Sequence, residues 1–212
     1  MVCVREFLVT MSGFFYYVGA VFESVLSVFG VRATYEHPKY QVVGHINDQV
    51  EIRAYGPRTA VETPIDQAND GAAFGRLFRY ITGANQGASK ISMTVPVEMA
   101  PQRIAMTVPV EMTSPGLMRF FLPESVVEKG APTPTDPLVH LVQLPPQTFA
   151  VLHFSGTLTP ESRREHQQQL MDAVAASGRH AVGEPSVLSY DPPFALPFVR
   201  HNEVAVGLVG EK

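Results

Sequence analysis

A nine-residue phrase that occurs twice in the middle of the chain constrains the fold more than any other feature. Residues 91–99 read ISMTVPVEM and residues 104–112 read IAMTVPVEM, so only the second position differs. In both copies apolar residues alternate with threonine, valine and glutamate, which is typical of a pleated strand. Pro96 and Pro109 lack a backbone N–H, so each copy is expected to bend, to bulge or to lie at an edge there. The repeat predicts a hairpin of two bent strands.

Two kinds of side chain in the repeat have alternative interpretations. Met93 and Met106 occupy equivalent positions of the two copies. Methionine is flexible and polarizable, so it suits an adaptable apolar binding site as well as ordinary core filling, and composition alone favours the core. Glu98 and Glu111 also match. We expect both to point outward, with an acid or base role in a pocket as the alternative.

The bulk properties of the chain limit its functional class. It has 212 residues and a formal net charge of −4, so there is no basic surplus that would favour a nucleic acid as partner. The single cysteine, Cys3, excludes an intrachain disulfide and a thiolate metal cluster. The length suits one substantial core, or one domain with an appendage.

Residues 1–33 are expected to form an apolar helix that precedes a folded domain over residues 34–212. Residues 7–22 carry no charge, Glu23 interrupts the run, and apolar residues resume through residue 31. A membrane span needs roughly 20 residues, a length that is reached only beyond Glu23. A membrane anchor, a signal peptide, an amphipathic surface helix and a helix packed on the domain are the alternatives. We therefore expect a cytoplasmic chain, or one associated with a membrane through residues 7–31.

The domain itself reads as strands interrupted by two helices. A hairpin is expected around Asn47 and Asp48, and apolar residues at helical spacing predict a helix over residues 66–85. Pro160 and Gly178 bracket a second helix over residues 161–177. A similar order of elements occurs twice, which predicts two similar halves of one mostly antiparallel α+β domain. The predicted strands are residues 41–46, 49–55, 58–63, 91–99, 104–112, 117–122, 138–144, 148–154, 186–190 and 203–209.

Four stretches together resemble the SOUL haem-binding protein family. They are VEIRAY at residues 50–55, FGRLFRYITGAN at 74–85, the doubled MTVPV phrase, and YDPPFALPFVRHNEV at 190–204. The resemblance covers about residues 40–209. It implies a distorted, eight-stranded, mostly antiparallel barrel of two pseudo-symmetric halves, each with one flanking helix. It also implies binding of haem, expected as non-covalent haem b, or of a related tetrapyrrole.

The resemblance places the tetrapyrrole in an apolar groove beside the first domain helix. That helix would supply an apolar wall and two arginines for the propionates, because a guanidinium binds carboxylates bidentately. The alternative is that the apolar stripe faces the core and the arginines are solvated. With the two methionines of the repeat, the candidate cofactor-binding residues are Phe74, Arg76, Leu77, Phe78, Arg79, Ile81, Met93 and Met106.

The iron ligand and the function are less constrained. Haem iron takes His, Met, Cys or Tyr, and His45 and His166 are the histidine candidates, each with a packing or surface role as the alternative. No nucleophile, phosphate or zinc motif is visible. We expect a non-catalytic tetrapyrrole binder used for buffering, transport or sensing. The alternatives are a GyrI-like binder or hydrolase of another lipophilic molecule, which a buried glutamate with a raised pKa would favour, and a membrane-held interaction module.

Overall fold

The computed structural model describes residues 36–65, 70–86, 102–113, 116–191 and 195–210. The predicted N-terminal helix and the first copy of the repeat, with Met93, lie outside these residues. In the described part of the chain, no helix has the length and apolar character that a membrane crossing requires. The anchor over residues 7–31 stays a prediction.

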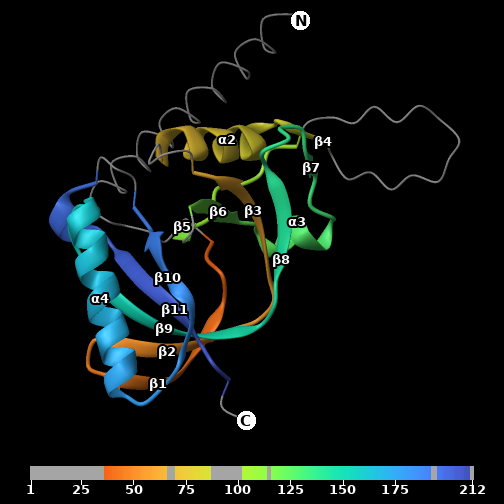
Figure 1. The fold of residues 1–212 in the computed structure, drawn as a ribbon. Helices are drawn as coiled ribbons and strands as arrows, with labels where there is room; N and C mark the ends of the chain where they lie inside the picture. The colour runs from red at the N-terminus through yellow and green to blue at the C-terminus, as the bar shows by residue number, and fades with distance from the viewer. Residues whose placement is uncertain (1–35, 66–69, 87–101, 114–115, 192–194, 211–212) are drawn as a thin grey trace, which may run out of the picture.

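Nine strands form one antiparallel sheet in the order β1–β2–β9–β11–β10–β5–β6–β3–β8, and Figure 1 shows that this sheet is strongly curled. The short strands β4 (Asn85–Gln86) and β7 (Thr133–Pro134) pair separately. The strands of the large sheet are β1 (Tyr40–Asn47), β2 (Val50–Tyr55), β3 (Arg58–Pro64), β5 (Val110–Thr113), β6 (Leu117–Phe121), β8 (His140–Leu144), β9 (Gln147–Phe154), β10 (Ala181–Ser189) and β11 (Asn202–Leu208).

The expected closure into an eight-stranded barrel is wrong. β1 and β8 lie at the two ends of the strand order, and within the described residues no ladder joins them. The pairing of β1 with β2 shifts register between Val42 and Gly44 and again between His45 and Asn47. Such irregularities twist an edge strand and end its pairing, so β1 remains an edge.

The described residues contain three α-helices, α2 (Asp70–Thr82), α3 (Glu124–Glu128) and α4 (Pro160–Ala176), and a 3₁₀ turn, η1 (Pro197–Val199). The two predicted helices are therefore confirmed, whereas α3 falls between the predicted strands 117–122 and 138–144, where no element was predicted. The Thr159 side chain caps α4 by accepting a hydrogen bond from the backbone N–H of Ser162, at 3.1 Å.

The second copy of the repeat is a strand only at its end. β5 begins at Val110, because Pro109 cannot donate to a ladder and the preceding N–H groups are used elsewhere. The N–H of Ile104 donates to the carbonyl of Ile81 at 2.8 Å, and that of Val108 to the carbonyl of Glu36 at 3.0 Å. The predicted hairpin between the two copies involves residues outside the described ranges.

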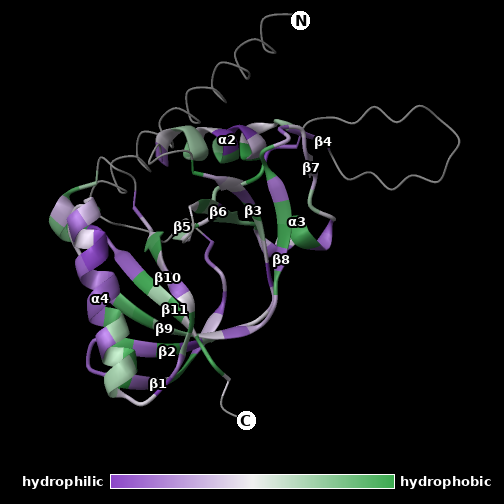
Figure 2. Cartoon of the chain, viewed as in Figure 1, coloured by the Kyte–Doolittle hydropathy of each residue, from purple (hydrophilic) through white to green (hydrophobic). Residues whose placement is uncertain are grey.

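Each long helix covers its own section of the sheet. α4 packs against β1, β9, β10 and β11, and α2 packs against β3 and β6. We call β1, β2, β9, β10 and β11 the α4 section of the sheet, and β3, β5, β6 and β8 the α2 section. Leu170 lies in the core cluster under α4 and Leu77 in the cluster under α2. Figure 2 shows that much of α4 is hydrophilic, as expected for a helix with a solvated outer face. The pseudo-symmetry of the two halves stays a prediction.

Candidate functional site

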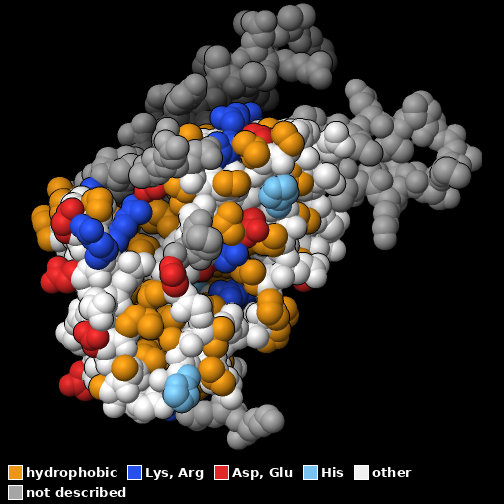
Figure 3. All heavy atoms as spheres, in the orientation of Figure 1, with side chains coloured by type: hydrophobic (Ala, Val, Ile, Leu, Met, Phe, Trp, Pro, Cys, Tyr) orange, Lys and Arg blue, Asp and Glu red, His pale blue; other side chains and the backbone are white. Residues whose placement is uncertain are grey.

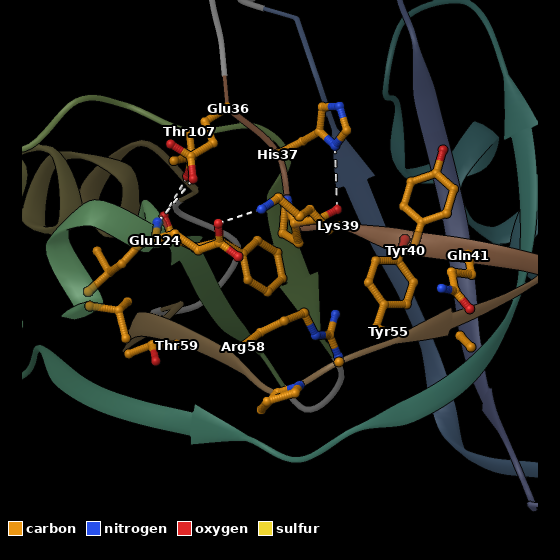
Figure 4. A pocket seen from close by; sticks show the side chains of 17 residues that line it. Glu36, His37, Lys39, Tyr40, Gln41, Tyr55, Arg58, Thr59, Thr107 and Glu124 are labelled. Atoms are coloured by element: carbon orange, nitrogen blue, oxygen red, sulfur yellow. Dashed lines mark hydrogen bonds and ion pairs between the residues drawn. The ribbon is translucent and has the colours of Figure 1, made fainter.

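An open cleft lies between the segment that leads into β1, the turn from β2 to β3, and α3 (Figure 4). Its larger part has a volume of about 820 Å³ and its smaller part about 280 Å³, which together suit a small-molecule ligand. The two parts meet at shared lining residues, so we treat them as one cleft. The shared residues are His37, Pro38, Tyr40, Tyr55, Arg58 and Phe121.

A buried ion pair closes the inner end of the cleft. Arg53 on β2 and Glu203 on β11 are 5% and 1% exposed, and the guanidinium Nη1 lies 2.9 Å from the carboxylate Oε1. Arg53 also donates from Nε to Glu51 at 2.7 Å. The Tyr190 hydroxyl donates to Glu203 at 2.7 Å, and Nε2 of His201 lies 2.9 Å from the same carboxylate. The acceptor capacity of Glu203 is therefore largely used within the protein.

This environment fixes the charge of the cluster. Burial opposes ionisation of Glu203, but the hydrogen bond from His201 and the charge of Arg53 outweigh it, so the pKa of Glu203 lies below its usual value. Burial raises the pKa of Tyr190, and the adjacent Glu203 raises it further. At neutral pH the cluster holds an ionised carboxylate and a protonated phenol. The hydrolase alternative would be favoured by the opposite direction at Glu203.

Arg58, the first residue of β3, has a different environment. Its guanidinium carbon lies 4.6 Å from the ring centre of Tyr55, 5.1 Å from that of Phe149 and 5.4 Å from that of Phe121. Its buried Nε has no hydrogen-bond partner among the residues that the structure describes. Burial lowers the pKa of Arg58 from its usual value.

The apolar stripe predicted on α2 divides between the core and the surface. Leu77 and Ile81 are buried in the cluster under the helix. Phe74 and Phe78 are 36% and 45% exposed, and their rings are stacked with centres 6.0 Å apart. The structure thus brings two of the four predicted wall residues together on an open face.

The other candidates of this groove also differ in their contacts. Arg76 donates from Nε to the Thr63 hydroxyl at 2.9 Å, which holds it against the end of β3. Arg79 is largely exposed, and its Nη2 lies 3.6 Å from a carboxylate oxygen of Asp136. Met106 is half-buried and packs against the cluster under α2. A role of these residues in cofactor binding stays a prediction.

Neither candidate histidine lies on α2. His45 is an exposed residue of β1. His166 on α4 stacks on Phe154 with ring centres 3.8 Å apart, and its Nδ1 lies 2.7 Å from the Ser162 carbonyl oxygen. The described residues contain no group of three or more His, Cys, Asp or Glu side chains that could hold a metal ion. Iron ligation by His45 or His166 stays a prediction.

Two glutamates that the sequence did not mark as buried are internal. Glu203 is the first residue of the predicted strand 203–209, and Glu111 was expected to point outward. Glu111 is buried and lies 3.4 Å from Nη1 of Arg119. The usable signal for Glu203 is its place near the start of NEVAVGL, a strand with no alternating polar face, because such a strand is buried on both sides.

Comparison with known proteins agrees with this architecture. The chain is 26% identical to Heme-binding protein 1 of Xenopus tropicalis over 141 residues, which cover 66% of this chain and 71% of that protein. It is similar in fold to a chain in a solved structure of an EcmrR–DNA complex, with a TM-score of 0.53 and 10% identity over 97% of this chain and 66% of that chain. The match to the EcmrR C-terminal domain has a TM-score of 0.50 and 11% identity, and it covers 80% of this chain and 98% of that chain. The model of the SOUL heme-binding protein family matches residues 35–207, so this chain belongs to that family.

Proposed function

We propose that this chain binds haem or a related tetrapyrrole, without covalent attachment and without catalysis, in a buffering, transport or sensing role. Family membership and the name of the amphibian relative support the ligand class. The observation that supports a location is the stacked, exposed pair of phenylalanines on α2. When bound, haem would supply an iron centre and a chromophore.

The phenylalanine pair suits the flat apolar face of a porphyrin. Phe74 also contacts Phe120 edge-on, with ring centres 5.2 Å apart, so its position is fixed by the core beneath it. Full burial of an exposed aromatic side chain gains roughly 1.5–3 kcal/mol, and part of this gain is withheld while the two rings face solvent. Figure 3 shows hydrophobic side chains beside positive ones on the side of the molecule where α2 lies. A porphyrin on this face would cover the rings of Phe74 and Phe78.

Arg79 is the better placed of the two arginines to meet a propionate. Its contact with Asp136 is long and exposed, and surface ion pairs of this kind contribute little, so exchanging the partner costs little. Arg76 is already held by Thr63 and therefore adds charge near the face rather than free donors. The half-buried Met106 belongs to the apolar layer beneath the helix.

A hemin titration of the full chain, followed by its Soret band, tests the proposal. Saturation near one equivalent is expected. The double variant Phe74→Ser, Phe78→Ser should lower affinity by about tenfold or more, because two apolar contacts are lost. The matched control is Val42→Ser, Val43→Ser, which removes two apolar side chains that are at least as exposed, on the edge strand β1 of the α4 section. Equal losses in both variants, or none, would contradict the proposed face.

Two further proposals rest on the sequence alone. They are haem b as the particular cofactor and membrane association through residues 7–31. The alternative of a lipophilic binder or hydrolase would use the cleft, where the lowered pKa of Glu203 makes it a poor general acid. No catalytic role is therefore proposed for Glu203.

A further inference from the structure

Arg58 stands apart from the other cations of the cleft because it forms no ion pair within the described residues, although the charge of Glu111 acts on it. The Lys39 ammonium is paired with Glu124, and Arg53 is paired with two carboxylates. In contrast, no ion pair or hydrogen bond of the Arg58 side chain occurs within the described ranges. Arg58 lines both parts of the cleft, so this unpaired charge lies where the two parts meet.

The rings around Arg58 leave its donors unsatisfied. Tyr55, Phe149 and Phe121 lie 4.6–5.4 Å from the guanidinium carbon, and such rings interact with the face of the cation. The N–H donors point outward in the guanidinium plane, where aromatic rings offer no strong acceptor. Within the part of the chain that the structure describes, Nε is buried and has no hydrogen-bond partner. Figure 4 shows the guanidinium beside the Tyr55 ring, within the cleft.

An anion would complete this arrangement. A desolvated positive charge is unfavourable unless it is paired and hydrogen-bonded. A carboxylate matches the fork of guanidinium donors with two parallel hydrogen bonds. The carboxylate would therefore gain a charge-assisted bidentate contact and give the Arg58 guanidinium direct hydrogen-bond acceptors.

The surroundings restrict the remainder of the ligand. The rings of Tyr40 and Tyr55 lie 5.3 Å apart at a tilt of 46°, and both line the cleft, so the walls favour a flat aromatic body. Glu36 and Glu124 line the larger part, and Glu203 lines the inner end. These carboxylates would repel a second or third negative charge on the ligand. The cleft therefore favours a single negative charge placed at Arg58.

We propose that the cleft binds a small, planar aromatic monocarboxylate, with its carboxylate on Arg58 and its ring among the aromatic walls. This site is separate from the tetrapyrrole face on α2 and does not depend on it. The volume of about 820 Å³ accommodates a ligand of one or two fused rings.

The probe for this site is 2-naphthoate, titrated into the full chain by calorimetry, with uncharged 2-naphthamide as the matched ligand. We expect 2-naphthoate to bind at one saturable site. 2-Naphthamide should bind at least about tenfold more weakly. Arg58→Gln should weaken the binding of 2-naphthoate by about tenfold and leave the affinity for 2-naphthamide unchanged. The control Arg164→Gln on α4 removes an equally charged but exposed side chain and should leave both affinities unchanged. Urea unfolding of each variant verifies that it is folded.

Three results would overturn the proposal. They are the absence of saturable naphthoate binding, equal affinities for the acid and the amide, and an unchanged naphthoate affinity in folded Arg58→Gln. Saturating hemin should leave naphthoate affinity unchanged. Competitive displacement of naphthoate by hemin, together with a loss of hemin affinity in Arg58→Gln, would instead make the cleft part of the tetrapyrrole site. Failure of hemin to bind at all would leave the naphthoate result, and hence this inference, intact.

Discussion

The two sections of the sheet contain the same kind of ion cluster at different depths. In the α4 section Arg53 pairs with Glu203, and their side chains are 6% and 2% exposed. In the α2 section Arg119 pairs with Glu62, and the values are 19% and 16%. Each arginine also contacts a second carboxylate. Because strand residues alternate between faces, and the neighbours of these residues pack under α4 or α2, both clusters lie on the face opposite the helices.

The helices of the two sections differ in the reverse sense. α4 buries only Leu170 and Val174, and its remaining surface is rich in polar residues. α2 leaves Phe74 and Phe78 exposed above a complete core. Ion clusters occur in both sections, so we interpret them as part of the fold. The exposed aromatic pair occurs on one helix only, so we interpret it as a ligand-binding feature.

The largest expected effect concerns the depth of the ion clusters. Arg53→Leu should lower the free energy of unfolding by about 3–5 kcal/mol, because it leaves Glu203 buried without its cation. Arg119→Leu should cost less, since Arg119 and its nearer partner Glu62 are partly exposed, although Glu111 is buried. Urea unfolding at neutral pH measures both variants. Equal losses of unfolding free energy in the two variants would contradict the claim that the more deeply buried cluster contributes more to stability.

The two cores are expected to respond alike. Leu77 and Leu170 are both fully buried, so Leu77→Ala and Leu170→Ala should each cost about 2–5 kcal/mol of unfolding free energy. The same urea experiment applies, with Leu141→Ala at the exposed edge strand β8 as the control. If either leucine variant lost less than about 1 kcal/mol of unfolding free energy, the packing of that helix on its section of the sheet would not be important for stability.

Acid should act on the deeper cluster. The folded-state pKa of Glu203 lies below its usual value of 4.5, so its contribution to stability is full above that value and is lost as pH falls through the folded pKa. Unfolding free energy measured from pH 7 to pH 3 should therefore fall less steeply in Glu203→Gln than in the parent chain. Parallel curves would show that Glu203 does not carry this pH dependence.

The smallest expected effect separates the two helices by charge. Arg79→Glu should weaken hemin binding by about threefold to tenfold, as expected for loss of an exposed contact with a propionate. Arg164→Glu makes the same charge change on α4 and should have no effect. Hemin titrations at two salt concentrations measure this, since screening should reduce the difference. Equal weakening by both variants would indicate only a general charge effect.

The elements that depend on local patterns were predicted correctly from the sequence. Alternation and the Asn47–Asp48 turn predicted the β1–β2 hairpin, and helical spacing predicted α2 and α4. The ligand class came from family resemblance, because the residues alone indicate only an apolar face.

The missed features depend on contacts between distant segments. Glu203 is buried because β11 lies between β9 and β10. Arg58 forms no ion pair within the described residues, and aromatic rings from β2, β6 and β9 surround its guanidinium. Closure of the sheet depends on its two edge strands, which are far apart in sequence. Local patterns do not report any of these relationships.

Hydrogen exchange of the full chain with and without saturating hemin tests the central claim most directly. If the tetrapyrrole covers the aromatic face, exchange should slow in α2 (Asp70–Thr82) and stay unchanged in α4 (Pro160–Ala176). Protection confined to the cleft, in Val50–Tyr55 and Glu124–Glu128, with none in α2, would contradict the account.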